Sequence, residues 1–553
     1  MGDFIVMKRI ILICLFACFA FESFSQDRYI IFLKDKANTP YQVNNPAEFL
    51  SPRAIARRTA MNISIDSADI PVNPSYLLSI ANTGARILNT SRWFNTVTVQ
   101  ADTNQVIAIG GFNYVDRYVK VFGSNLHRKV IKSKYEEVDA TEITSQRKTV
   151  LGNYGGALNQ TQMIGADALH SAGYTGRNSV IAVIDAGFSN ADIHPAFDSL
   201  RLQNRLLGTW NFSTNTENVY GFSNHGTSVL SCMAALVPDT MIGTAPHAQY
   251  YLLRSEEEAT EYEVEEYNWT AAAEYADSVG ADIINSSLGY TEFDAASQNH
   301  TYADMNGNTA VVTLAAKMAS EKGVFVVNSA GNSGNDSWFY IGAPADAEEV
   351  FTIGSVNAFE DISGFSSNGP TSDNRIKPDV CAQGSQTFLA RPSDLSYGTG
   401  SGTSSSSPVT AGFSACAFEL YKTTHPSAKP AEVKAWIKKY ADRANQPNNQ
   451  YGYGIPDGSK LLLNASTGTN VSNKYKIYPN PSTSTLFIDV NNGNNRVWTL
   501  QISDALGKIL AESDYNTIEL MMGIELPANI SKGFYIISLS TENDSFKQVI
   551  IKE

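Results

Sequence analysis

The sequence predicts a chain of three folded parts, of which the central one is an α/β domain built around a mainly parallel sheet. From about residue 154 to 463, short β-branched runs alternate with helical stretches, which is typical of strand–helix–strand units. Before this region the order is β-α-β-β-α-β, and after it a polar linker leads to a β-rich end. With 553 residues, the chain is long enough for several domains.

Composition narrows the class of protein. Hydrophobic residues make up 43% and charged residues 17%, which excludes a chain that is mostly disordered. The formal net charge of −14 disfavours a nucleic-acid partner, because a negative surface repels phosphate. Of five cysteines, Cys14 and Cys18 lie in a segment that we expect to be removed, and the remaining three do not make a disulfide framework.

The first residues have the order of a secretory signal peptide. Lys8-Arg9 is followed by an apolar run from Ile10 to Phe21 and then by small residues, so we place a signal peptide at 1–25. A membrane-spanning helix needs about 20 residues. The apolar run is shorter than this, and no later uncharged stretch reaches that length. We therefore expect an exported protein without a transmembrane anchor.

Residues 26–124 are predicted to form a small α+β domain. A β-α-β-β-α-β order suits a ferredoxin-like sheet with helices on one face, a fold that by itself specifies no activity. The expected strands are Tyr29–Leu33, Ala85–Leu88, Thr96–Val99 and Tyr114–Phe122, and the expected helices are Pro46–Thr59 and Thr103–Ile109. Residues 125–152 are rich in Lys, Arg, Glu and Thr, which predicts an exposed connector with a processing site.

The central domain, residues 153–463, carries polar residues directly after its predicted strands. The expected strands are Val180–Ile184, Tyr250–Leu253, Ile283-Ile284, Val324–Asn328 and Val350–Val356. Ligands of parallel sheets bind beyond the carboxyl ends of the strands, so these positions are the first candidates for a site.

Two candidates are an acid and a histidine. Asp185 ends the first strand, where a buried carboxylate needs a partner, and it could be a ligand, a cap or a catalytic group. His225-Gly226 precedes the helical stretch Ser228 to Leu236, so the imidazole lies at a helix start and the glycine allows close approach of another segment. A single histidine is more often structural.

A third candidate is the glycine- and serine-rich loop from Gly398 to Pro408, which opens a helical stretch from Val409 to Lys422. Backbone donors at a helix start suit a serine whose attack creates an oxyanion, although a capping serine in a flexible loop is the simpler interpretation of the loop alone. Asp, His and Ser in this chain order are the order of the subtilisin triad rather than of chymotrypsin or the Ser-Asp-His hydrolases.

The three segments Asp185-Ala-Gly187, His225-Gly-Thr227 and Gly402-Thr-Ser404 with Pro408 resemble the active-site signatures of subtilisin-like serine proteases. The resemblance spans roughly 300 residues and implies a secreted serine endopeptidase with an acyl-enzyme intermediate. It implies that Asp185 orients the imidazole, His225 shuttles the proton and Ser404 attacks the peptide carbonyl. No cofactor is required for this chemistry.

The same resemblance implies further site residues. Ser329-Ala-Gly-Asn332 matches the oxyanion segment, with Asn332 as the amide donor. Substrate-binding positions are implied for Ser287, Leu288, Gly289, Ala330 and Gly331.

The sequence departs from the family pattern at three places. Ala186 stands where Ser or Thr is usual, and Ser405-Ser406 replaces a commonly apolar and small pair. Ala196 stands where some relatives have an acidic calcium ligand, so no metal residue is assigned and structural calcium stays open.

The chain ends in a predicted linker, 464–473, and a predicted small β-sandwich, 474–553. Three motifs in this module, Tyr478-Pro-Asn-Pro481, Asp504-Ala-Leu-Gly-Lys508 and the segment Leu526 to Tyr535, resemble the C-terminal sorting domain of type IX secretion. The resemblance implies the type IX machinery as a partner, passage through a Gram-negative periplasm, and a secreted or cell-surface product. The protease resemblance makes residues 26–124 a propeptide that inhibits the protease and assists its folding.

Two alternatives and one specificity question remain. A noncatalytic surface adhesin or scaffold on a protease-like fold would be favoured by an incomplete triad. A lipase or esterase would need Gly-x-Ser-x-Gly, which Gly402 to Ser406 lacks. Residues 255–266 hold seven glutamates. They fit a solvated helix start, where acidic side chains complement the helix dipole. If they border the substrate cleft, they would instead favour substrates with basic residues upstream of the scissile bond.

Overall fold

The computed structural model describes residues 27–123, the short strands β5 (Glu137–Val138) and β6 (Lys148–Thr149), residues 151–465 except 258, and parts of the C-terminal module. These parts are 475–478, 482–490, 498–504, 508–515, 521–527, 530–540 and 545–552. The predicted signal peptide, most of the predicted connector and most of the predicted linker lie outside the described residues.

The first domain is a four-stranded antiparallel sheet in the order β2-β3-β1-β4, with two helices packed on it. Its strands are β1 (Asp27–Leu33), β2 (Arg86–Ser91), β3 (Thr96–Ala101) and β4 (Val115–Phe122), and its covering helices are α3 (Pro74–Ala81) and α4 (Thr103–Gly110). Ile31, Val97 and Ile80 are fully buried in its core. The expected α+β fold is confirmed.

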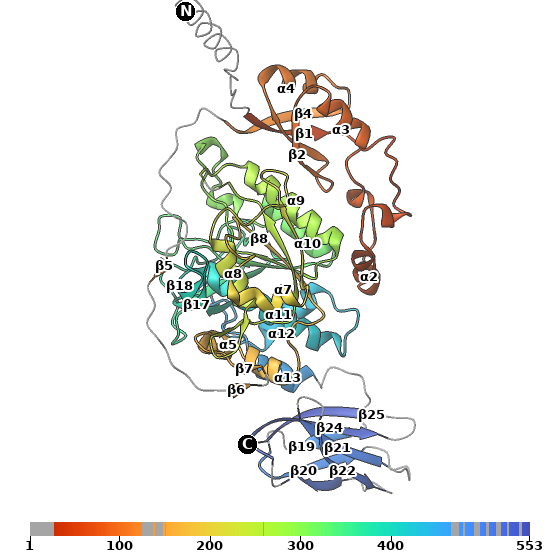
Figure 1. Cartoon of the computed structure of the whole chain (residues 1–553), viewed down its shortest axis with the longest axis vertical. Helices are drawn as coiled ribbons and strands as arrows, with labels where there is room; N and C mark the ends of the chain where they lie inside the picture. Colours follow the sequence, from red (N-terminus) through yellow and green to blue (C-terminus); the bar gives the residue numbers. More distant parts are fainter. Residues whose placement is uncertain are drawn as a thin grey trace, which may run out of the picture.

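One predicted helix of this domain is in the wrong place. The stretch predicted as Pro46–Thr59 forms η1 (Pro46–Glu48) and α2 (Pro52–Ala60), followed by η2 (Ser67–Asp69), and α2 lies away from the sheet (Figure 1). The helix that covers the sheet is α3, where Asn73 caps the first turn by accepting from Ser75 N and Pro74 occupies the first position.

The central domain holds a seven-stranded parallel sheet in the order β16-β15-β14-β13-β8-β12-β9. The strands are β8 (Val180–Asp185), β9 (Leu206–Asn211), β12 (Gln249–Arg254), β13 (Ile283–Ser286), β14 (Phe325–Ser329), β15 (Phe351–Val356) and β16 (Val380–Gln383). All five predicted strands are present, and β9 and β16 were not predicted.

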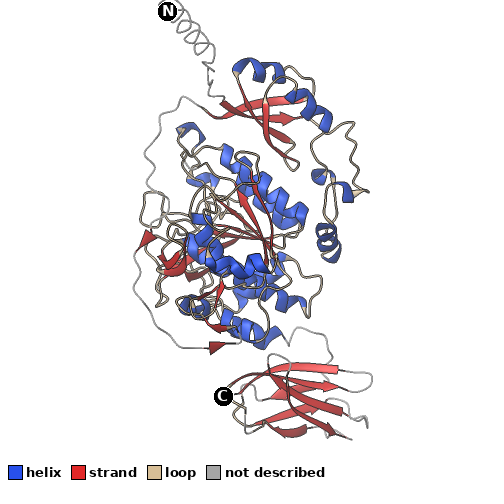
Figure 2. Ribbon diagram, viewed as in Figure 1, coloured by secondary structure: helices blue, strands red, loops and turns tan. Residues whose placement is uncertain are grey.

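Helices cover both faces of this sheet (Figure 2). On one face α8 (His225–Ala234) and α11 (Thr403–Lys422) pack against Ile181 and Val183 of β8. On the other face α9 (Val264–Val279) and α10 (Val311–Glu321) pack against Ala182 and Ile184. Successive residues of β8 therefore enter two different cores, as expected for a strand buried on both sides.

Shorter elements complete the central domain. They are β7 (Gly152–Asn153), α5 (Leu158–Met163), α6 (Ala166–Ser171), η3 (Pro195–Phe197), α7 (Asp198–Leu202), β10 (Leu236–Val237), β11 (Met241–Ile242), η4 (Ala296–Gln298), η5 (Tyr302–Asp304), β17 (Thr387–Arg391), β18 (Ser396–Gly400), α12 (Pro430–Lys439) and α13 (Gly458–Ala465).

The C-terminal module consists of two antiparallel sheets, in the orders β19-β20-β23 and β22-β21-β24-β25. The strands are β19 (Tyr475–Tyr478), β20 (Thr485–Val490), β21 (Trp498–Asp504), β22 (Ile509–Tyr515), β23 (Met521–Glu525), β24 (Gly533–Ser540) and β25 (Ser545–Lys552). Its core includes the buried Leu486, Ile502 and Ile537, so the predicted β-rich module with its own core is confirmed.

Candidate active site

Asp185 ends strand β8 in the interior of the sheet and is fully buried. Its Oδ1 atom accepts a hydrogen bond from the Ala186 backbone N–H at 2.8 Å and lies 2.8 Å from Nδ1 of His225. Among the described residues, its second oxygen Oδ2 has no hydrogen-bond partner. The alanine at 186 has no hydroxyl to offer to that oxygen.

His225 is the first residue of α8, and Gly226 allows it to lie over Asp185. The Gly226 N–H donates to the Gly187 carbonyl at 3.0 Å, and a Cβ at Gly226 would come within 2.4 Å of that oxygen. The close approach expected from the glycine is therefore present. When Nδ1 carries the hydrogen and donates to Asp185, Nε2 is the basic nitrogen of the ring.

Ser404 lies in the first turn of α11, which packs against α8, so Ser404 and His225 stand at the starts of neighbouring helices. The helix begins at Thr403 rather than at Val409, which places Pro408 inside the helix instead of near its start. The glycine- and serine-rich segment is thus partly helical. All of the residues from Thr403 to Pro408 are buried.

Asn332 follows strand β14 and faces Ser404 across Gly402. Its Oδ1 accepts hydrogen bonds from the backbone N–H and the hydroxyl of Thr403, at 2.9 and 2.8 Å. A Cβ placed on Gly402 would lie 2.8 Å from Ser404 Oγ, 3.3 Å from Asn332 Nδ2 and 3.6 Å from Ser404 N. A hydroxyl and two N–H donors therefore surround one small space, which is the arrangement that a substrate carbonyl needs.

A pocket of about 210 Å³ opens beside this space. Its lining residues are Ser287, Leu288, Gly289, Thr291, Ser329, Ala330, Gly331, Asn332, Ser333, Trp338, Tyr340, Gly342, Ser367, Thr403 and Ser404. All of the residues predicted to bind substrate line it. Within the described part of the chain, none of the lining side chains is ionisable at neutral pH, and Trp338 and Tyr340 add aromatic surface.

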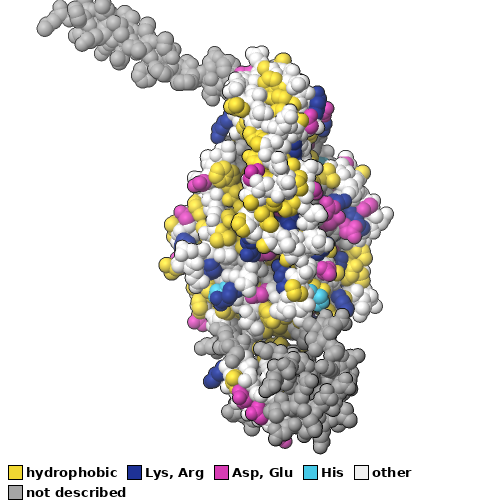
Figure 3. All heavy atoms as spheres, turned by 90° about the vertical axis from the view of Figure 1, so that its right-hand side faces the viewer, with side chains coloured by type: hydrophobic (Ala, Val, Ile, Leu, Met, Phe, Trp, Pro, Cys, Tyr) yellow, Lys and Arg dark blue, Asp and Glu magenta, His cyan; other side chains and the backbone are white. Residues whose placement is uncertain are grey.

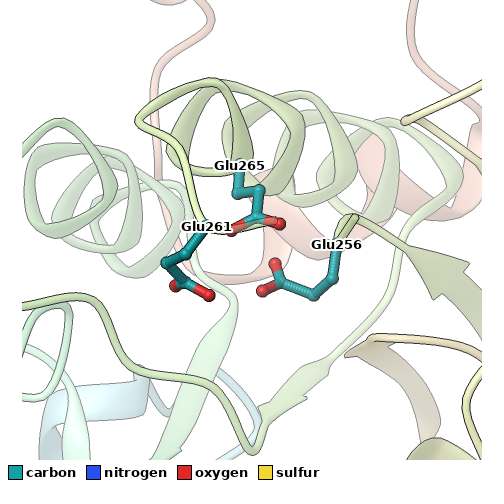
Figure 4. A group of neighbouring side chains, drawn as sticks. All are labelled: Glu256, Glu261 and Glu265. Carbon is teal, nitrogen blue, oxygen red and sulfur yellow. The ribbon is translucent and has the colours of Figure 1, made fainter. Parts of the chain in front are cut away.

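Three glutamates of the acidic segment 255–266 converge below the start of α9 (Figure 4). Ligand atoms of Glu256, Glu261 and Glu265 all lie within 4.8 Å of one another, close enough to hold one metal ion. The Tyr290 hydroxyl donates to Glu256 at 2.5 Å. These three side chains are buried, so the interpretation of the run as a solvated helix start is wrong for them.

Glu266 of the same segment is also buried and has a structural role. It contacts His300 Nε2 at 2.5 Å and accepts from the backbone N–H of Val312 at 3.0 Å. Burial lowers the pKa of His300, but the hydrogen bond and charge of Glu266 outweigh burial and raise this pKa above its usual value.

Sequence reasoning missed Thr403, Trp338 and Tyr340. Thr403 orients the Asn332 amide through two hydrogen bonds, and its hydroxyl also accepts from the Gly331 N–H at 3.1 Å. Its position next to Ser404 was the only available signal. The two aromatic residues reach the pocket from a loop that has no motif.

Comparison with known protein families gives three matches along the chain. Residues 176–454 match the subtilase family, residues 28–137 match the Peptidase S8 propeptide domain of Bacteroidota, and residues 476–553 match the secretion system C-terminal sorting domain. The resemblances drawn from the sequence motifs are thereby confirmed.

Similar curated proteins are named as subtilisins or as proteases. Subtilisin E of Bacillus subtilis (strain 168) is 29% identical over 343 residues, which cover 61% of this chain and 79% of that protein. Subtilisin of Bacillus pumilus is 32% identical over 296 residues, which cover 53% of this chain and 94% of that protein. The human membrane-bound transcription factor site-1 protease is 30% identical over 342 residues, which cover 60% of this chain and 28% of that protein.

Among the described residues, no helix has the length and apolar character needed to cross a membrane.

Proposed function

The chain belongs to the subtilase family and is a secreted subtilisin-like serine endopeptidase, and we propose that it cleaves peptide bonds through an acyl-enzyme formed on Ser404. The observation that carries the proposal is the single space bounded by Ser404 Oγ, Ser404 N and Asn332 Nδ2. A carbonyl there would meet a nucleophile and two oxyanion donors together.

The proposed reaction follows from these positions. His225 Nε2 takes the proton of Ser404 while Oγ bonds to the substrate carbonyl carbon, and the oxyanion accepts from Asn332 and the Ser404 backbone. His225 then returns the proton to the leaving amine. In the second half of the reaction, water takes the place of the amine: His225 removes its proton while it attacks the acyl carbonyl carbon, and the proton returns to Ser404 as the acid leaves. Asp185, hydrogen-bonded to Nδ1 at 2.8 Å, holds the ring and stabilises the imidazolium.

The neutral pocket with its aromatic side chains supports a preference for an uncharged apolar side chain immediately before the scissile bond. The propeptide and sorting-domain matches support synthesis as an inactive precursor that engages the type IX secretion machinery. We propose that cleavage of the segment 125–152 separates the propeptide and that the C-terminal module is removed during export.

The decisive experiment uses the secreted protein, a fluorophosphonate probe and a peptide library. We expect labelling and cleavage by the parent and neither by Ser404→Ala or His225→Ala. The loss in kcat should approach about a millionfold, the magnitude known for the corresponding losses in subtilisin. Equal labelling of the parent and Ser404→Ala would overturn the assignment.

A further inference from the structure

The propeptide has a long excursion between β1 and α3, residues 34–73, which we call the arm. It contains α2 and leaves the propeptide sheet to lie beside the catalytic domain (Figure 1). Seen from that side in Figure 3, the propeptide and the catalytic domain form one continuous surface. Lys36, near the start of the arm, holds the two ends of the arm together and to the sheet domain, since its Nζ donates to the carbonyls of Ser67, Ile70 and Arg92.

Arg58 of α2 lies between two buried carboxylates, one in the arm and one in the catalytic domain. Its guanidinium donates to both oxygens of Asp69 in the arm, at 3.0 and 2.9 Å, and to both oxygens of Asp277 in α9, at 3.0 and 2.8 Å. The three side chains are no more than 1% exposed. Lys322 of the catalytic domain adds a contact to Asp69 at 2.9 Å.

Asp277 also accepts hydrogen bonds from two further propeptide arginines. Arg57 of α2 donates to Asp277 Oδ1 and to the carbonyl of Ala281, and Arg92 in the β2–β3 turn donates to Asp277 Oδ2 at 2.8 Å. One carboxylate of α9 therefore receives three propeptide guanidinium groups. Removal of one partner from such a buried cluster leaves charge without compensation, which is costly.

The end of α2 adds apolar anchoring. Met61 is 3% exposed and belongs to the same hydrophobic core as α8 and α11, and Ile63 packs against that core. The arm thus inserts a side chain into the catalytic domain rather than resting on its surface. Its attachment combines this burial with the charge cluster at Asp277.

We propose that the arm is a docking element in its own right, which holds the propeptide on the catalytic domain after the connector has been cut, with Asp277 as its receptor. The proposal rests on the proposed function only in that the connector is cleaved. The rate at which the cut propeptide is released should then depend on the Arg58–Asp277 contact and on an intact arm.

The test uses the full-length Ser404→Ala chain with the recognition sequence of a site-specific protease inserted after residue 135. External cleavage makes the result independent of the chain's own activity. We expect the cut propeptide to co-elute with the catalytic domain in size-exclusion chromatography. Arg58→Gln should raise its dissociation rate by about a hundredfold or more, because a buried charge pair is broken.

Lys120→Gln is the matched control, since Lys120 is a propeptide cation whose ion-pair partner Asp27 lies in the same domain. It should leave the rate within about threefold of the parent. Immediate loss of the propeptide from the cut parent, or a parental rate for Arg58→Gln, would overturn the proposal.

A second measurement avoids any effect of Arg58→Gln on folding. Further protease sites at the exposed Asn44 and Ser64 allow α2 to be severed from the propeptide sheet after the chain has folded. The sheet should then dissociate at least about tenfold faster than it does after the connector cut alone. An unchanged rate after complete cleavage would show that the arm does not hold the propeptide.

Discussion

Pro408 stands four residues after Ser404 in α11, so the backbone N–H that would bond the Ser404 carbonyl in a regular helix is missing. The carbonyl accepts instead from the hydroxyl of Ser287, at 3.0 Å. Ser287 directly follows β13 and lines the pocket. Ser404, the proposed nucleophile, is therefore hydrogen-bonded to the segment that borders the pocket.

Ser287→Ala should lower kcat about tenfold with little change in KM, because it leaves the buried carbonyl of Ser404 unpaired, at a cost of about 1–3 kcal/mol. Pro408→Ala supplies the missing N–H. The double variant should therefore recover part of the activity lost in Ser287→Ala. Steady-state kinetics of the four proteins form the cycle, and simply additive losses would contradict the link.

Gly402→Ala should nearly abolish hydrolysis without unfolding the protein, because its Cβ would fill the space beside Ser404 Oγ and Asn332 Nδ2. The expected loss in kcat/KM is at least about a hundred- to a thousandfold, which is the range known for loss of one oxyanion donor in subtilisin. Gly221→Ala is the control, since a Cβ there has room. Comparable activity in the two variants would disprove the assignment.

Ala186→Ser should stabilise the catalytic domain by about 1 kcal/mol, because a hydroxyl beside Asp185 could donate to the buried Oδ2. Thermal unfolding in the Ser404→Ala background measures the effect without self-digestion. Ala191→Ser is the counterpart, since it adds a hydroxyl in the apolar core and should destabilise. A lower melting temperature for Ala186→Ser would count against the prediction.

His170 should make the protein sensitive to acid. Burial lowers its pKa to about 4, and the ring contacts the Tyr154 hydroxyl at 2.6 Å and the Thr244 carbonyl at 3.0 Å. Because the unfolded pKa is near 6.5, the unfolded state takes up the proton first. The stability held above pH 6.5 is thus lost as pH falls toward 4, by up to about 3 kcal/mol.

Urea unfolding at pH 7, 6 and 5 measures this loss. His170→Gln should give a flatter dependence on pH than the parent. His247, whose pKa burial also lowers to about 4, should maintain part of the slope in that variant. An identical slope in parent and His170→Gln would exclude a contribution from His170.

The central sheet was largely predictable because its interior strands are apolar on both faces. The two strands that were missed are the edge strands, β9 and β16, which have fewer β-branched residues or only four residues. In the first domain, the sequence correctly predicted a helix that overlaps α2, but the predicted fold placed this helix on the face of the sheet. Its real position depends on contacts with Asp277, more than 200 residues away, which no local pattern encodes.

The candidate site was predictable where short motifs carry it. Asp185, His225, Ser404 and Asn332 follow strands or begin helices at the expected edge of the sheet, and their chemical roles stay predictions. The burial of the glutamates in 255–266 was not predictable, since it depends on Tyr290, His300 and Val312 from other segments.

The contact between Asn332 and Thr403 joins positions 71 residues apart, and the one between Ser404 and Ser287 joins positions 117 apart. These contacts cannot form early: during synthesis at about 5–20 residues per second, a chain that has already emerged through Asn332 still lacks Ser404, the proposed nucleophile. Chains that end before Ser404 should therefore be proteolytically inert. Activity should thus depend on synthesis and folding of nearly the entire catalytic domain, a safeguard that acts before any inhibition by the propeptide.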